Sequence, residues 1–140
     1  YTKRNIPHCL AVLDIDYFKK VNDSYGFDVG DQVLKVLALY MRKHFGSGLT
    51  ARLGGEEFAV LLHGVDSDQL YNKLDDFRRE ISVSALPAGD AQVSITISIG
   101  VVLDSKDELP KQMNEADNAL FQAKDHGRNQ IVISGAEEHE

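Results

Sequence analysis

Two pairs of acidic residues are the clearest candidates for chemistry in this chain. Asp14 and Asp16 end the apolar run CLAVLDI, and Glu56 and Glu57 follow a Gly-Gly pair. Carboxylates beside an exposed backbone carbonyl can bind a hard cation, and adjacent acids repel each other unless a cation offsets their charge. Magnesium is usually held by one or two carboxylates and phosphate oxygens, so the pattern predicts a site that a nucleotide completes. Taken alone, Asp14 and Asp16 also fit a helix cap and a solvated surface acid.

Basic residues on both sides of these acids are candidate phosphate ligands. Lys19 and Lys20 follow the first acidic pair, and Lys124 and Arg128 flank Gly127. Lysine and arginine bind phosphate oxygens through charge-assisted hydrogen bonds. Simpler roles also fit: a solvated helix face for Lys19 and Lys20, and a helix C-terminus ended by Gly127 for the other two.

Asn22 and Asp31 offer donor and acceptor groups that could recognise the edge of a base. Each also fits its local context without a ligand. Asparagine is common in turns, and aspartate is common in the first turn of a helix.

The composition is that of an ordinary folded domain. The 140 residues include 15 Lys and Arg against 22 Asp and Glu, a net charge of −7. This balance argues against a broad nucleic-acid surface and against a polybasic membrane contact. Cys9 is the only cysteine, and no signal peptide or long apolar span is visible, so a cytoplasmic location is expected.

Hydrophobic periodicity predicts an α+β fold that brings the acids together. Strands are expected at residues 9–15, 49–53, 58–62, 93–103 and 130–133, and helices at 29–45, 66–83 and 110–127. The second and third strands form a hairpin with Glu56 and Glu57 at its tip, while Pro87, Gly89 and Asp90 break the chain before the long alternating strand. This order resembles a ferredoxin-like βαββαβ core: a central, mostly antiparallel sheet, helices packed on one side, and an added hairpin or edge strand. The acids converge if the first strand neighbours the hairpin.

Four separate stretches carry a family signature. They are LDIDYFKKVNDSYGFDVGD at residues 13–31, RLGGEEF at 52–58, SITISIGV at 94–101 and ALFQAKDHGRNQI at 119–131. In this order and spacing they resemble the GGDEF domain of diguanylate cyclases, in its GGEEF variant, from about residue 9 to residue 133. The resemblance implies a nucleotidyl-cyclase-like fold. It also implies condensation of two GTP molecules into cyclic di-GMP with release of two pyrophosphates, a reaction of bacterial second-messenger signalling.

The resemblance assigns catalytic roles residue by residue. It implies a magnesium site made by Asp14, the backbone carbonyl of Ile15 and Glu56, with Mn²⁺ as an alternative metal. Glu56 is also the candidate base for the attacking 3′-hydroxyl, and Glu57 supports the metal or that proton transfer. The division of labour between the two glutamates stays open. Lys19 would offset charge that grows in the transition state.

Substrate contacts follow from the same resemblance. Asn22 and Asp31 would recognise guanine and so select GTP over ATP. Phosphate contacts are implied for Phe18, Lys19, Lys124 and Arg128. Gly54 and Gly55 would let the backbone approach the nucleotide closely. Because one domain positions one GTP, the symmetric product implies a two-fold homodimer, which need only be transient.

Three departures from the family pattern stand out. Phe27 replaces the histidine that commonly follows the glycine at that position. Phe45 and Gly48 occupy the positions of the inhibitory RxxD motif, so product inhibition through that site is expected to be lost. The usual lead-in helix with its DxLTGLxNR signature does not precede residue 9.

These features define the expected domain and its alternative. The catalytic domain is expected at residues 1–133 and a flexible acidic tail at 134–140. An upstream sensory or dimerisation module is expected in the parent chain, where a membrane anchor stays open. The alternative function is a non-catalytic GTP- or cyclic di-GMP-binding module. The intact set of implied site residues favours the enzyme, and Phe27 favours the alternative.

Overall fold

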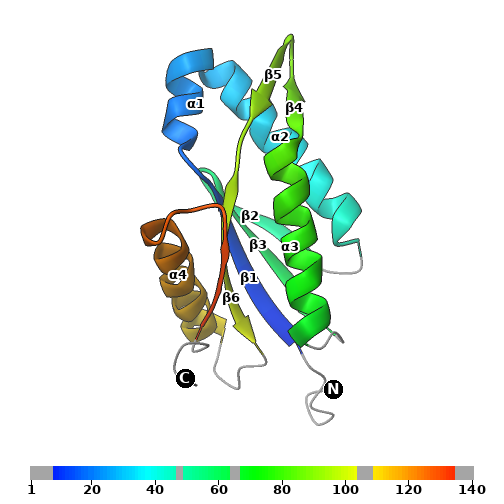
Figure 1. Cartoon of the computed structure of the whole chain (residues 1–140), viewed down its shortest axis with the longest axis vertical. Helices are drawn as coiled ribbons and strands as arrows, with labels where there is room; N and C mark the ends of the chain where they lie inside the picture. Colours follow the sequence, from blue (N-terminus) through cyan, green and yellow to red (C-terminus); the bar gives the residue numbers. More distant parts are fainter. Residues whose placement is uncertain (1–7, 47–48, 64–66, 104–108, 135–140) are drawn as a thin grey trace.

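The fold of the chain is given by a computed structural model, which describes residues 8–46, 49–63, 67–103 and 109–134 (Figure 1). The strands are β1 (His8–Ile15), β2 (Leu49–Gly54), β3 (Glu57–His63), β4 (Ala85–Ala88), β5 (Ala91–Ser94), β6 (Ile97–Leu103) and β7 (Ile131–Ile133). The helices are α1 (Phe18–Tyr25), α2 (Phe27–His44), α3 (Ser67–Val83) and α4 (Leu109–Asp125). Within these ranges, none of the helices combines the length and apolar character needed to cross a bilayer.

The main sheet has the strand order β2-β3-β1-β6-β7. Its first four strands pair antiparallel, and β7 joins β6 in parallel as an added edge strand. The predicted α+β fold with a mostly antiparallel sheet is therefore confirmed. The strand β1 lies in the middle, so its C-terminal end is flanked by the hairpin β2-β3 on one side and by β6 on the other.

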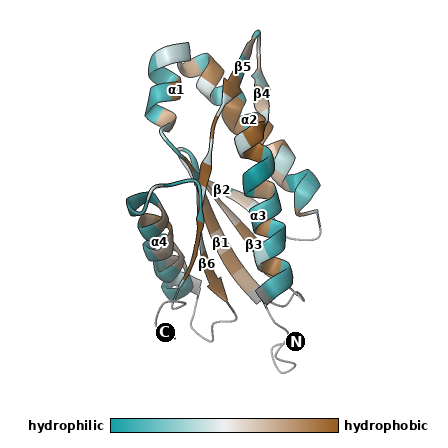
Figure 2. Ribbon diagram, in the orientation of Figure 1, coloured by the Kyte–Doolittle hydropathy of each residue, from teal (hydrophilic) through white to brown (hydrophobic). Residues whose placement is uncertain are grey.

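Helices cover both faces of the sheet (Figure 1). Successive side chains of a strand point to opposite faces, and β1 contributes Ala11 and Leu13 to the core beneath α2 and α3 but Leu10 and Val12 to the core beneath α4. Figure 2 shows the apolar residues on the strands between these helices. The prediction that the helices pack on one side of the sheet is thus confirmed for α2 and α3 and wrong for α4. The strands β1 and β6 are apolar on both faces, so the second face is covered by α4.

The single long strand expected at residues 93–103 is wrong. The chain instead forms a hairpin of β4 and β5, separate from the main sheet, and then β6. Thr96, between β5 and β6, is held at the end of β1: its carbonyl accepts from the Asp16 N–H at 2.9 Å, and its hydroxyl donates to the Asp16 carboxylate at 2.6 Å. The residues before Thr96 therefore pair with each other, as β4 and β5, beyond the end of the main sheet. Gly89, with a φ of +63°, forms the turn of this hairpin.

Candidate active site

Three of the four carboxylates of the two acidic pairs, those of Asp14, Glu56 and Glu57, lie near one another at the C-terminal end of β1. Asp14 lies directly opposite Glu57 in the β1–β3 ladder, and Glu56 precedes Glu57 at the hairpin tip. Asp14 is buried, whereas Glu56 and Glu57 are half-buried. The convergence predicted from the order of the elements is confirmed.

Asp14 has one oxygen that is paired and one that is not. Its Oδ2 accepts a hydrogen bond from the Lys124 ammonium, while its Oδ1 is buried without a partner. Burial raises the pKa of Asp14, the Lys124 hydrogen bond and charge lower it, and the charges of Glu56 and Asp16 add to the rise. A buried carboxylate oxygen without a donor, beside further carboxylates, suits a hard cation.

The protein side chains alone do not make a complete metal site. Within the described ranges, no group of three or more His, Cys, Asp or Glu side chains is arranged to hold a metal ion. Ile15 is the last residue of β1, and its side chain is buried, so it would contribute through its backbone. This donor set fits magnesium, which is usually bound by one or two carboxylates together with waters and substrate phosphates.

Asp16 has surroundings quite different from those of Asp14. Its carboxylate accepts hydrogen bonds from the Thr96 hydroxyl at 2.6 Å, the Ser98 hydroxyl at 2.6 Å and the Asn129 N–H at 3.0 Å. Both oxygens are therefore engaged by the protein. Asp16 joins the end of β1 to β6 and to the loop before β7, and its oxygens do not face the carboxylates of Glu56 and Glu57.

The loop that Asp16 holds, residues 127–130, is also held from α3. Arg78 donates through one Nη to the Asn129 carbonyl at 3.2 Å and to its side-chain oxygen at 2.9 Å. Asp75 fixes that arginine, with contacts of 2.9 Å to Nε and 2.8 Å to the other Nη. Arg128 and Asn129 both have positive φ, 65° and 49°, a conformation that needs such support. Sequence reasoning missed Arg78, whose only signal is its i,i+3 spacing from Asp75.

Lys124 and Arg128 lie together beside the acids. Lys124 pairs with Asp14, and Arg128 donates to the Lys124 carbonyl at 3.0 Å. The guanidinium of Arg128 lies 4.7 Å from the centre of the Tyr17 ring, while its Nε is buried without a partner. Of the two cations predicted near Gly127, Lys124 thus reaches the carboxylate cluster, and Arg128 lies next to it over the Tyr17 ring.

Asn22 and Asp31 line one pocket of about 290 Å³, formed by α1, α2 and the tip of the β2-β3 hairpin. Phe18 and Phe27 line the same pocket, and Phe27 is 79% exposed. The position of the Asn22 side chain depends on Gly30, because a Cβ there would lie 1.9 Å from the Asn22 side-chain oxygen. Gly30 carries no chemistry of its own, and sequence reasoning did not single it out.

Glu57 has a second acidic neighbour that sequence reasoning also missed. Burial, a hydrogen bond with Asp117 on α4, and the charges of Asp117 and Asp14 raise the pKa of Glu57 to about 7, against a smaller lowering by Lys124. Asp117 lies seven residues before Lys124 on α4. That spacing, which places both residues on one helix face, was the available signal.

Comparison with known proteins identifies the family. A family model described as "Diguanylate cyclase, GGDEF domain" matches residues 2–130. The chain belongs to the GGDEF family. It is 39% identical over 132 residues to the probable diguanylate cyclase DgcT of Escherichia coli (strain K12), covering 91% of this chain and 29% of that protein. The GGDEF domain therefore spans less than a third of the length of this curated relative.

Solved structures agree with the fold. The GGDEF domain of DgcB from Caulobacter crescentus, in complex with c-di-GMP, matches with a TM-score of 0.88 and 32% identity, covering 96% of this chain and 81% of that one. The active GGEEF domain of a diguanylate cyclase from Vibrio cholerae matches with a TM-score of 0.84 and 26% identity, covering 95% and 86%. The predicted nucleotidyl-cyclase-like fold of this GGDEF domain is confirmed.

Some predicted site residues of this GGDEF domain make no contact with the carboxylates of Asp14, Glu56 and Glu57. The Lys19 side chain is 89% exposed and pairs with Asp23 at 3.4 Å. A Cβ at Gly54 or Gly55 would meet nothing within 4 Å, so the space beside the turn is open to a ligand. Gly55 has a φ of +52°, which by itself explains the glycine.

The positions of the inhibitory motif are partly described. Phe45 is fully buried at the end of α2, with its ring 5.1 Å from that of Phe77. Its side chain is therefore part of the core and is not available to a ligand. Gly48 and the predicted tail from residue 135 onward lie outside the described residues.

Proposed function

We propose that this GGDEF domain is a diguanylate cyclase that condenses two GTP molecules into cyclic di-GMP and two pyrophosphates. The observation that carries the proposal is the buried, unpartnered Asp14 Oδ1 opposite Glu57. Lys124 pairs with the Asp14 carboxylate. Asn22 and Asp31, the proposed guanine-reading residues, line a pocket that includes Gly55 of the hairpin tip. In the GGEEF form of the signature motif, Glu56 stands in place of an aspartate and keeps a carboxylate at that position.

The residues present fit a divalent cation, with Mg²⁺ as the expected metal and Mn²⁺ as an alternative. Asp14, the Ile15 carbonyl and Glu56 would hold it, and when bound it would polarise the reacting phosphate and lower the pKa of the attacking hydroxyl. Lys124 offsets the Asp14 charge in the free domain. With GTP bound, Lys124 and Arg128 would contact the β- and γ-phosphates.

The glutamates share the handling of the proton. Glu56 is the candidate base for the 3′-hydroxyl, and Glu57 supports the metal or that proton transfer. Asp117 on α4 shares a hydrogen bond with Glu57, and this contact raises the pKa of Glu57. The attack itself depends chiefly on positioning, because in-line phosphoryl chemistry needs little covalent help from the protein.

Substrate selection and placement rest on the two helices after β1. Asn22 and Asp31 would read the guanine edge, and ATP would leave these polar groups unpaired. Phe18 would contact the phosphates through its backbone. Lys19, which is exposed on α1, would turn from Asp23 toward the growing charge.

The active assembly is a two-fold homodimer, in which each domain supplies one GTP and the two sites face each other. It need only form transiently. The parent chain is expected to place a sensory or dimerisation module before a catalytic domain at residues 1–133, with the reaction in the cytoplasm, where GTP is available.

The test is incubation of the 140-residue chain with GTP and Mg²⁺, followed by chromatography for cyclic di-GMP. The expected result is product from the wild type, none from Glu56→Ala, and none when ATP replaces GTP. The non-catalytic alternative predicts saturable GTP binding without product at any protein concentration. That outcome would overturn the enzyme proposal.

A further inference from the structure

Tyr17 forms the turn between β1 and α1 in a backbone conformation that tyrosine rarely adopts. Its φ is +58° and its ψ is +36°, in the left-handed region that glycine adopts without cost. It is the N-cap residue of α1, but its side chain makes no capping hydrogen bond. The residue is 60% exposed, so little apolar burial compensates for the backbone strain. The side chain of Tyr17 must therefore serve another purpose at this turn.

The Tyr17 ring attracts two cations. The guanidinium carbon of Arg128 lies 4.7 Å from the ring centre, and the Lys20 ammonium lies 5.7 Å from it. Both distances are within the range of about 6 Å over which an aromatic face attracts a cation. Among the described residues, no other cation lies over an aromatic ring, and no carboxylate pairs with Arg128. Tyr17 is thus a principal contact that orients the Arg128 guanidinium.

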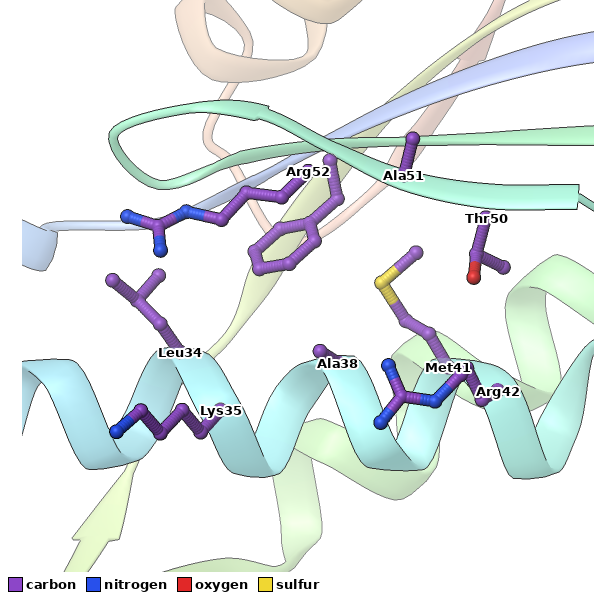
Figure 3. Close-up of a pocket in the computed structure, with 9 residues that line it drawn as sticks. Leu34, Lys35, Ala38, Met41, Arg42, Thr50, Ala51 and Arg52 are labelled. Atoms are coloured by element: carbon purple, nitrogen blue, oxygen red, sulfur yellow. The ribbon is translucent and has the colours of Figure 1, made fainter.

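A stacked ring holds an arginine without using its hydrogen-bond donors. Figure 3 shows two arginines placed differently, Arg42 and Arg52, which line a cavity of about 180 Å³ between α2 and β2. There the Arg52 Nε is used by the Gly55 carbonyl, at 3.0 Å. At Arg128 one Nη donates to the Lys124 carbonyl at 3.0 Å, and within the described ranges neither Nε nor the other Nη has an acceptor. The ring therefore fixes this guanidinium and leaves N–H groups for an anionic ligand.

The contact joins two segments that would hold the polyphosphate. Tyr17 directly precedes Phe18, and its carbonyl accepts from the Lys20 N–H at 2.9 Å, which fixes the first turn of α1. Arg128 belongs to the loop before β7. In the part of the chain that the structure describes, Tyr17, Arg128 and Asn129 are the non-glycine residues with positive φ. Two strained turns that are far apart in the sequence thus meet at one ring, and such strain is concentrated at functional sites.

We propose that Tyr17 is a positioning residue for the polyphosphate, which acts by holding the Arg128 guanidinium beside the β1–α1 turn. The proposal rests on the proposed function, in which Arg128 contacts the β- and γ-phosphates of GTP. Because GMP lacks these phosphates, Tyr17 would strengthen the binding of GTP and leave the binding of GMP unchanged. Recognition of the guanine base would not depend on it.

The position of Arg128 is tested by NMR of the 140-residue chain without nucleotide. The ring current of Tyr17 should displace the signals of the Arg128 side-chain protons. Tyr17→Phe should keep this displacement, because phenylalanine also offers an aromatic face. Tyr17→Leu should lose it, although leucine keeps an apolar side chain at the same backbone conformation. Equal Arg128 signals in the wild type and Tyr17→Leu would overturn the contact.

Nucleotide affinity, measured by calorimetry without Mg²⁺ so that no product forms, tests the consequence. Tyr17→Leu should weaken GTP binding by about two- to fivefold, as expected for one exposed contact between a cation and a ring, and Tyr17→Phe should restore most of it. GMP binding should be the same in all three proteins. Tyr25→Leu is the matched control, because Tyr25 is an exposed tyrosine at the other end of α1 and none of the described cations lies over its ring. Equal losses for GTP and GMP would indicate general damage to the site and would overturn the proposal.

A double-mutant cycle tests whether Tyr17 acts through Arg128. Arg128→Ala should weaken GTP binding, and adding Tyr17→Leu to it should weaken binding no further. A full additional loss, or GTP binding that Arg128→Ala leaves unchanged, would overturn the positioning role. In turnover, Tyr17→Leu should raise the KM for GTP by the same factor with little change in kcat. If the wild type makes no cyclic di-GMP, the proposed function fails, while the affinities still decide the role of Tyr17.

Discussion

At the scale of single residues, Asp14 and Asp16 show how two aspartates in one motif serve different purposes. Asp14 has an oxygen without a donor, whereas Asp16 accepts three hydrogen bonds from the protein. A buried carboxylate with an unpaired oxygen, such as Asp14, weakens the fold and is available to a ligand. A carboxylate with three hydrogen bonds, such as Asp16, stabilises the fold.

Substitutions should separate these two roles. Asp16→Ala should lower the free energy of unfolding by about 3 kcal/mol, because hydrogen bonds to a charged group contribute about 1.5–3 kcal/mol each and do not add fully. Asp14→Asn should lower the free energy of unfolding less than Asp16→Ala does, because relief of the desolvation cost of the buried Asp14 carboxylate offsets part of the loss of its pair with Lys124. It should also abolish Mg²⁺-dependent product formation. Urea unfolding followed by circular dichroism measures the stability of both variants. Equal losses of stability would contradict the distinction between Asp14 and Asp16.

Glu57 should make the stability of the domain depend on pH. Its pKa is raised from 4.5 to about 7 on folding, so the folded state binds the proton more tightly than the unfolded state. The contribution of protonated Glu57 to the free energy of unfolding is therefore fully present below about pH 4.5 and is lost as the pH rises through about 7. Glu57→Gln, which mimics the protonated form, should be more stable than the wild type at pH 8 and similar to it near pH 4.5.

Urea unfolding across this pH range checks the prediction. Asp117→Asn is the companion variant, because it removes the main acidic neighbour and should flatten the same part of the profile. Parallel profiles for the wild type and Glu57→Gln would show that Glu57 does not titrate in this window.

Residue types alone predicted which side chains gather but not how they interact. The sequence predicted that Asp14, Glu56 and Glu57 converge if the first strand neighbours the hairpin, and the pairing of β1 with β3 meets that condition. It could not distinguish Asp14 from Asp16, because the difference lies in partners about 80 to 110 residues away. Asp117 was missed for the same reason, since its contact with Glu57 depends on α4 packing across the sheet.

At the scale of elements, the loop before β7 depends on a helix that carries no proposed site residue. Arg78 of α3 holds Asn129, which neighbours Arg128, and Asp16 holds the same residue from the other side. The position of a proposed phosphate ligand is thereby set by packing between distant elements.

Arg78→Ala should loosen this loop and raise the KM for GTP by about tenfold or less, as expected for the loss of one or two hydrogen bonds, with little change in kcat. Arg79→Ala is the matched control, since Arg79 also bonds to Asp75, at 3.1 Å, but has no bond to Asn129. Steady-state kinetics and thermal unfolding of both variants test this. If the two variants raise KM equally, the effect comes from α3 and not from the loop.

Most elements were predictable because their apolar period is clear, as in α2 and β1. Two failures have a common physical cause. The break at Thr96 and the position of α4 are both decided by contacts between distant segments, with Asp16 in one case and with the second apolar face of β1 in the other. A local pattern gives the type of an element more reliably than its partner.

At the scale of the whole molecule, the acidic character acts on assembly. Two domains that each carry a net charge of −7 must meet face to face for the proposed reaction, so their mutual repulsion opposes the active dimer. Specific activity should therefore rise with protein concentration until the dimer is saturated. Moderate salt should shift this rise to lower concentration, because screening over about 8–10 Å weakens the repulsion. Rates of cyclic di-GMP formation over a dilution series at two ionic strengths, with sedimentation on the same samples, give the measurement. A specific activity that does not change on dilution while sedimentation shows a monomer would mean that one domain completes the reaction alone.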